Sequence, residues 1–121
     1  MEKPLDGDTR IRGLKMKISK FEQGYLMFDD GSYISSEWCS KCYENNYADF
    51  SAIDDLAKAI DFSEDLIFER ADYGFRFGNN PYFMVFVPCY SEQNGYYTPD
   101  VDIWYNDKLV LKGVEGEIID R

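Results

Sequence analysis

Three cysteines are the residues of this sequence best suited to chemistry of their own. Cys39 and Cys42 lie in the segment Trp38-Cys39-Ser40-Lys41-Cys42, which has the spacing of a dithiol redox site, and Cys89 lies far along the chain. Redox catalysis requires such a pair at a helix N-terminus after a buried strand, where a thiolate is stabilised. Here the flanking residues are polar and no strand–helix–strand unit follows, so we interpret the cysteines as small structural side chains.

The same thiols are the candidates for a metal centre. Zinc takes four ligands, most often cysteine and histidine, and the chain has no histidine. A site built on Cys39, Cys42 and Cys89 would need a carboxylate or a water molecule as its fourth ligand, and it stays as the alternative interpretation. Histidine is also the commonest general base. Its absence argues against most enzymes, and we predict neither catalysis nor a cofactor.

Most of the secondary structure that the sequence predicts consists of strands, which must position the cysteines. Apolar and polar residues alternate over residues 14–18, which predicts a half-buried strand. Further strands are predicted over residues 25–28, 32–36, 66–70, 73–77, 82–87, 101–105 and 109–111. Asp30-Gly31 and Asn106-Asp107 lie between such runs and favour tight turns. The segment 82–87 is apolar on both faces, which predicts a central strand.

One helix is predicted as well. Apolar residues recur at positions 53, 56, 57 and 60, the spacing of one helix face, and Asp49 or Ser51 can cap its N-terminus. The length suits one domain with its own core. We predict a single α+β domain over residues 1–121, with residues 1–10 as a loose lead-in. A mostly antiparallel twisted sheet of about six to eight strands would carry one main helix on one face.

Charge is distributed unevenly along the chain. The sequence holds 13 Lys+Arg and 23 Asp+Glu, a formal net charge of −10, although its first 20 residues hold six basic and three acidic residues. The acids are densest between residues 49 and 72, where eight of them accompany only Lys58 and Arg70. Such a surface repels nucleic acid and attracts basic partners. Spread over a folded face, it can imitate a phosphate backbone and occupy a basic groove.

Aromatic residues are the second signal of the composition. They make up 17% of the chain and include ten tyrosines, and tyrosine offers a large amphipathic contact area at interfaces. Many aromatic residues should fill a β-rich core, whereas those near turns are candidates for exposure. The residues predicted to contact a partner are Asp49, Asp54, Asp55, Asp61, Glu64, Asp65, Tyr43, Tyr47, Tyr96 and Tyr97.

The sequence also indicates a compartment. Residues 1–10 are polar and lack the apolar run of a signal peptide. The apolar segment 82–87 is far too short to span a bilayer, and an odd number of cysteines fits a reducing cytosol. We therefore expect a cytoplasmic protein.

Several motifs follow one another in a recognisable order. They are Asp30-Gly31, Tyr33, Cys39 and Cys42 with nearby Glu44, Leu56, and Asn94-Gly95-Tyr96-Tyr97. In this order they resemble a family of small uncharacterised domains from bacteria and their phages, typified by Asp-Gly, Cys-Cys-Glu and Asn-Gly-Tyr-Tyr motifs, over about residues 14–106. The resemblance implies an α+β fold and a phage or mobile-element origin, and it implies no activity.

These observations predict a non-enzymatic inhibitor of a host nucleic-acid-handling or defence protein, of the anti-CRISPR or anti-restriction type. An acidic, tyrosine-rich surface would dock on a basic groove of that host protein, without direct contact to nucleic acid or membrane. The inhibitor would be a monomer or homodimer in the host-cell cytoplasm. Two alternatives stay open. One is a small-molecule or metal-binding domain that uses Cys39, Cys42, Cys89 and tyrosines, and the other is a structural subunit that self-associates through aromatic sheet faces.

Overall fold

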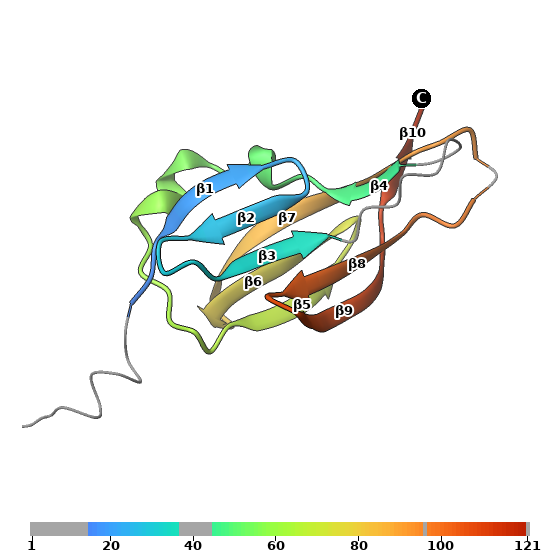
Figure 1. Cartoon of the computed structure of the whole chain (residues 1–121). Coiled ribbons are helices and arrows are strands. Elements are labelled where there is room, and N and C mark those ends of the chain that lie inside the picture. The colour runs from blue at the N-terminus through green and yellow to red at the C-terminus, as the bar shows by residue number, and fades with distance from the viewer. Residues whose placement is uncertain (1–14, 37–44, 96, 121) are drawn as a thin grey trace, which may run out of the picture.

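The computed structural model describes residues 15–36, 45–95 and 97–120. Ten strands in these ranges form two five-stranded sheets. The sheets lie one behind the other in Figure 1, and the apolar core fills the space between them. This arrangement is a β-sandwich, in which each sheet buries one face against the other.

The first sheet has the strand order β1-β2-β3-β8-β9, and all its neighbours are antiparallel. Its strands are β1 (Ile18–Glu22), β2 (Tyr25–Phe28), β3 (Tyr33–Ser36), β8 (Asp100–Tyr105) and β9 (Lys108–Glu115). The two predicted tight turns are confirmed, because Gly31 (φ 92°) and Asn106 (φ 54°) adopt the left-handed backbone conformation between paired strands. The predicted alternation of burial is also confirmed over Lys15–Ile18, but the strand β1 begins only at Ile18 and ends at Glu22, and Met16 forms an isolated bridge with Phe62.

The second sheet is built around one long strand. It contains β4 (Asn45–Ala48), β5 (Ile67–Ala71), β6 (Gly74–Asn80), β7 (Phe83–Glu92) and β10 (Glu117–Ile119), in the order β10-β7-β6-β5 with β4 also paired to β7. The second half of β7 pairs with β4 antiparallel and with β10 parallel. Residues 45–48 and 117–119 were not predicted as strands, because neither short segment shows the alternation of a half-buried strand.

The predicted helix is wrong, and with it the α+β class. Two short 3-10 helices, η1 (Phe50–Ala52) and η2 (Asp55–Ala59), replace it. Between them Ile53 and Asp54 are extended, with ψ angles of 136° and 138°. The Asp54 side chain accepts a hydrogen bond from the Leu56 backbone N–H, a local bond that competes with helix continuation. Over the described residues the protein is therefore an almost all-β sandwich without a main helix.

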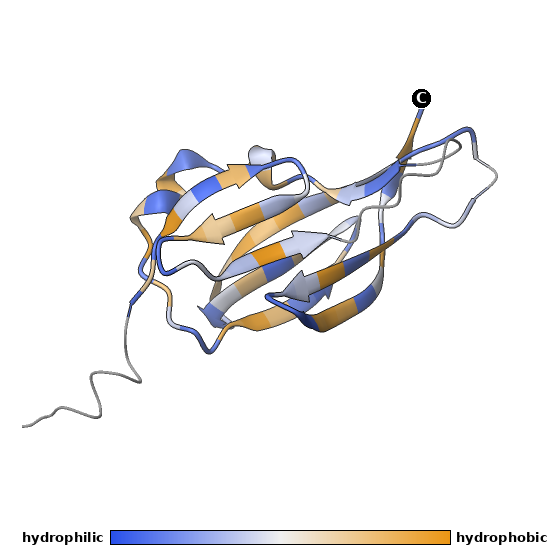
Figure 2. Cartoon of the chain, viewed as in Figure 1, coloured by the Kyte–Doolittle hydropathy of each residue, from blue (hydrophilic) through white to orange (hydrophobic). Residues whose placement is uncertain are grey.

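Aromatic rings join the two sheets in the core. Phe28 of β2 lies 5.6 Å from Phe62, and Phe62 lies 5.5 Å from Phe77 of β6, measured between ring centroids. All three rings are buried. Figure 2 shows the matching pattern along the strands, where hydrophobic and hydrophilic residues alternate. The alternation places one face of each strand in the core and the other at the surface.

Candidate functional site

The six predicted acids lie in three different settings. Asp49 and Asp54 precede η1 and η2, where each side chain accepts a backbone hydrogen bond, and Asp55 is exposed in the first turn of η2. Asp61 pairs with Lys17 at 2.6 Å and with Lys15 at 3.7 Å. The hydrogen bond from Lys17 is the main reason why the pKa of Asp61 lies below its usual range. Its charge is thus compensated within the protein.

Glu64 and Asp65 belong to a different group of carboxylates, near Tyr105 at the end of β8. The β2–β3 and β8–β9 turns lie at the same end of the sandwich (Figure 1). The Tyr105 hydroxyl donates to the Glu64 carbonyl oxygen at 3.3 Å. Burial raises the pKa of Tyr105, and the nearby charges of Asp30, Glu64 and Asp65 raise it further. We call Asp30, Glu64, Asp65 and Asp107 the acidic end; Asp107 accepts a hydrogen bond from Tyr33 nearby, at 3.2 Å.

The predicted tyrosines do not gather into one surface. Tyr47 is buried, donates to the Glu92 carboxylate at 3.3 Å, and packs against Tyr90. It therefore stabilises the interior and is not available to a partner. Tyr97 is exposed, and its backbone N–H donates to the Gln93 side chain at 2.8 Å. Tyr43 and Tyr96 lie outside the described residues.

A buried polar network holds the segment that follows β7. The Gln93 side chain donates to Ser91 Oγ at 2.6 Å, and Ser91 Oγ donates to the Asn46 side chain. Asn46 in turn donates to the carbonyl oxygens of Thr98 and Asp100, at 3.2 and 3.1 Å. Buried side chains satisfied in this way fix the chain that they bond. The network therefore anchors both ends of the connection that carries Asn94 and Gly95.

Of the three predicted thiols, the structure describes one. Cys89 lies on β7 and is fully buried, and this burial raises the pKa of its thiol to about 12. Cys39 and Cys42 lie outside the described residues. Among the residues that the structure does place, no three His, Cys, Asp or Glu side chains converge as metal ligands would.

We expect the Cys89 thiol to be inert in the folded protein. In a Cys39→Ser/Cys42→Ser variant, Cys89 is the sole thiol, and a buried thiol with a raised pKa supplies almost no thiolate at mildly alkaline pH. Ellman's reagent should react only after denaturant is added, and then with one thiol per chain. Rapid reaction under native conditions would contradict the burial of Cys89.

Leu56 and Phe83, two of the most exposed apolar side chains, line a groove that the sequence did not indicate, and Tyr82 directly precedes Phe83 in the chain. Leu56, Tyr82 and Phe83 are 77%, 95% and 64% exposed. The groove has a volume of about 420 Å³ and lies between the η1–η2 segment and the first half of β7. Its lining includes Ile53, Leu56, Ile60, Phe83 and Phe86, with Asp54 at the same surface. We call it the β7 groove.

The β7 groove corrects the prediction for residues 82–87. From Phe83 this segment does form a strand, but among the described residues it pairs with β6 alone up to Val87, so it is not central there, and because Phe83 and Phe86 remain exposed it is not buried on both faces. One signal in the sequence pointed to this exposure, because Tyr82 directly follows the turn-favouring residues Asn79-Asn80-Pro81. Large apolar side chains exposed together often mark an interaction surface.

Comparisons with protein-family models, with curated proteins and with solved structures found no match. The function of the β7 groove must therefore be argued from its own residues. In the described ranges, no helix is long and apolar enough to cross a membrane.

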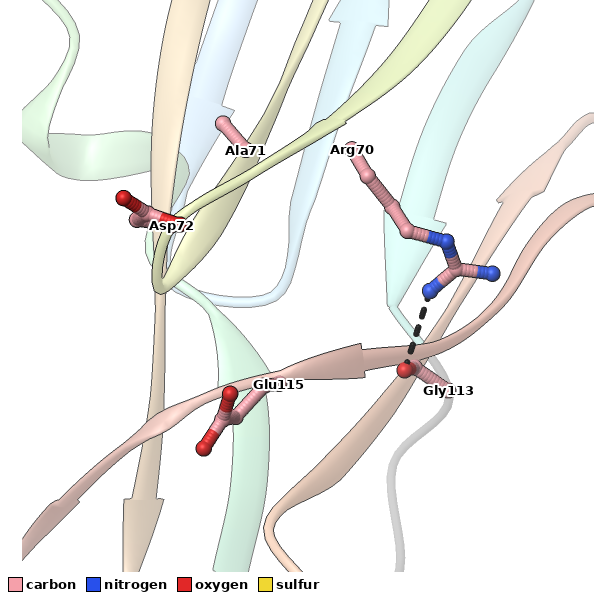
Figure 3. A pocket seen from close by; sticks show the side chains of 5 residues that line it. All are labelled: Arg70, Ala71, Asp72, Gly113 and Glu115. Carbon is pink, nitrogen blue, oxygen red and sulfur yellow. Dashed lines mark hydrogen bonds between the residues drawn. The ribbon is translucent and has the colours of Figure 1, made fainter.

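A second hollow, of about 310 Å³, lies between the β5–β6 turn and β9 (Figure 3). The Arg70 guanidinium donates to the carbonyl oxygens of Gly113 at 3.0 Å and Lys112 at 2.6 Å. Asp72 and Glu115 also line the hollow. Arg70 uses its guanidinium to bond backbone carbonyls of β9 and so connects the two sheets. We therefore assign Arg70 a structural role and do not interpret this hollow as a binding site.

Proposed function

We propose that this protein is a non-enzymatic binding module, of phage or mobile-element origin, that acts in the cytoplasm by docking on a basic host protein and inhibiting it. The observation that carries the proposal is the composition of the β7 groove. Exposed Leu56 and Phe83 line the groove together with Asp54, and their chain neighbours Asp55 and Tyr82 are exposed as well. Apolar anchors surrounded by charge are the usual anatomy of a protein interface.

The charge of the groove supports a basic partner. Within the described residues no ion pair neutralises Asp54 or Asp55, in contrast to Asp61 and Glu69, which pair with lysine and arginine. The chain as a whole carries a formal net charge of −10. A basic surface would be steered toward this protein over a distance set by the ionic strength. The relevant host proteins are those that bind nucleic acid, because they present lysine- and arginine-lined grooves.

Neutralising the two groove carboxylates should weaken capture of the partner. In the Asp54→Asn/Asp55→Asn variant, asparagine keeps the cap on η2 and removes two charges. The matched control is Glu117→Gln/Asp120→Asn, which removes two exposed carboxylates from the strand β10 and the residue after it. We expect the groove variant to bind the captured host protein about tenfold more weakly at low salt, and the control to bind like the unmodified protein.

The measurement is affinity capture from bacterial lysate at low and high salt, with mass spectrometry and then titration of the purified partner. A basic nucleic-acid-handling protein that is released by salt and lost with the groove variant would support the proposal. Equal binding by the groove variant and the control, or binding that salt does not weaken, would contradict it.

A further inference from the structure

The strand β7 has two edges, and the structure shows which residues turn their backbone N–H and C=O groups toward each edge. The Cys89 N–H donates to the Tyr73 carbonyl at 2.9 Å, and the register pairs Val87 with Phe75 and Val85 with Phe77. In an antiparallel pair, alternate residues of a strand turn both their N–H and C=O toward the same neighbour. Val85 and Val87 of β7 therefore bond to β6.

Two glycines of β6 independently support this assignment of the β7 backbone groups to their two edges. A Cβ built on Gly74 would lie 2.3 Å from the Val87 carbonyl oxygen, and one on Gly78 would lie 3.0 Å from the Phe83 carbonyl oxygen. These odd-numbered carbonyls thus point at β6. The N–H and C=O groups of Met84 and Phe86 must point to the opposite edge of β7.

The opposite edge is occupied only along the second half of β7. The Asp49 N–H donates to the Pro88 carbonyl at 2.8 Å, and β4 pairs with residues 89–92. Beyond Asp49 the chain turns away as η1. Over the part of the chain that the structure describes, no strand pairs with this edge between Phe83 and Val87, and no turn or loop backbone group bonds to Met84 or Phe86. The β7 groove opens along this unpaired stretch.

An unpaired strand edge is a template for one kind of ligand. The two N–H and two C=O groups of Met84 and Phe86 are spaced to bond a further extended strand, which adds to the sheet as β4 does farther along β7. Exposed Phe83 and Leu56 offer apolar contacts to alternate side chains of such a strand. Asp54 and Asp55 favour lysine or arginine at the remaining positions.

We propose that the β7 groove binds an extended, basic segment of the partner by strand addition to the Met84–Phe86 edge. The inference rests on the proposed function and names the kind of segment that the groove takes. A second copy of this chain is the less suitable occupant, because two molecules with a formal net charge of −10 each would bring their Asp54 and Asp55 carboxylates together.

The probe is a synthetic peptide of alternating lysine and valine, acetylated and amidated at its ends. We expect it to shift the backbone amide resonances of Met84 and Phe86 in the ¹⁵N-labelled protein, and to slow hydrogen exchange of these two amides at least tenfold. The same peptide N-methylated at every internal residue lacks the internal backbone donors and should bind at least tenfold more weakly. A glutamate–valine peptide should not bind.

A pair of variants tests the edge itself. Met84→Pro removes an N–H that points away from β6, so the existing sheet keeps its hydrogen bonds, whereas Met84→Ala keeps this N–H and removes the same side chain. We expect the proline variant to lose the peptide and the alanine variant to keep it. If Met84→Pro does not fold, the N-methylated peptide and the exchange measurement decide the question.

Three results would overturn the inference. They are equal affinity for the N-methylated peptide, shifts confined to the acidic end, and concentration-dependent shifts of Met84 and Phe86 without peptide, which would assign the edge to a second copy. None of these contradicts the proposed function, which fails if capture of the host protein does not depend on Asp54 and Asp55 or is not weakened by salt.

Discussion

Replacing Gly74 with alanine is expected to destabilise the protein by about 3 kcal/mol or more. Gly74 begins β6 opposite Pro88, and an added Cβ would lie 2.3 Å from the Val87 carbonyl oxygen and 2.8 Å from the Phe86 ring. The carbonyl belongs to the backbone of β7 and cannot move without disturbing the pairing with β6. Urea unfolding followed by circular dichroism measures the change in the free energy of unfolding.

Gly78→Ala is the control for this prediction, because we expect it to destabilise the protein less than Gly74→Ala. It adds the same methyl group to the same strand, but the nearest backbone atom, the Phe83 carbonyl oxygen, lies 3.0 Å away. A shift of a few tenths of an ångström relieves this contact, so the loss of stability should be clearly smaller. Equal stabilities for Gly74→Ala and the unmodified protein would mean that β6 and β7 approach less closely than described here.

Truncating Phe77 to alanine should cost about 3 to 5 kcal/mol of unfolding free energy. Phe77 is completely buried, and its ring lies 5.5 Å from that of Phe62 and 6.4 Å from that of Phe28, between centroids. Phe28 belongs to the first sheet and Phe77 to the second. The substitution leaves a cavity at the point where the two sheets share an aromatic cluster. The same urea titration measures the effect.

The comparison for Phe77 is Phe83→Ala. Phe83 is 64% exposed at the β7 groove, so its truncation should change stability by less than about 1 kcal/mol. A loss for Phe77→Ala no larger than that for Phe83→Ala would contradict the position of Phe77 in the core. The pair also separates residues that maintain the fold from residues available to a partner.

Local chemistry made most of the strands predictable. Alternation over Lys15–Ile18 and the turns at Gly31 and Asn106 depend on a few neighbouring residues, and the structure bears them out. The prediction of a helix was wrong for an equally local reason, which the spacing of its apolar residues does not reveal. Asp54 hydrogen-bonds to the Leu56 N–H and holds its own backbone extended, so the apolar spacing of residues 53–60 never becomes one helical face.

The candidate site was less predictable because exposure depends on distant segments. Tyr47 is buried by its pairing with Tyr90 and its bond to Glu92, 45 residues away in sequence. The edge of β7 at Phe86 is open because the chain turns away as η1 after Asp49. The lysines that compensate Asp61 lie on the segment before β1. None of these pairings has a signature within a window of neighbouring residues.

The order of strands in the first sheet has a consequence for synthesis on the ribosome. β3 borders β8, so the sheet cannot be completed until residues 100–115 have been translated. Until then β3 keeps an open edge, and the core lacks Val101, Ile103 and Val114. Pairings between segments so far apart form slowly. The nascent chain should therefore stay protease-sensitive and within reach of chaperones until residues 100–115 have left the ribosome, and the sandwich should then fold in one step.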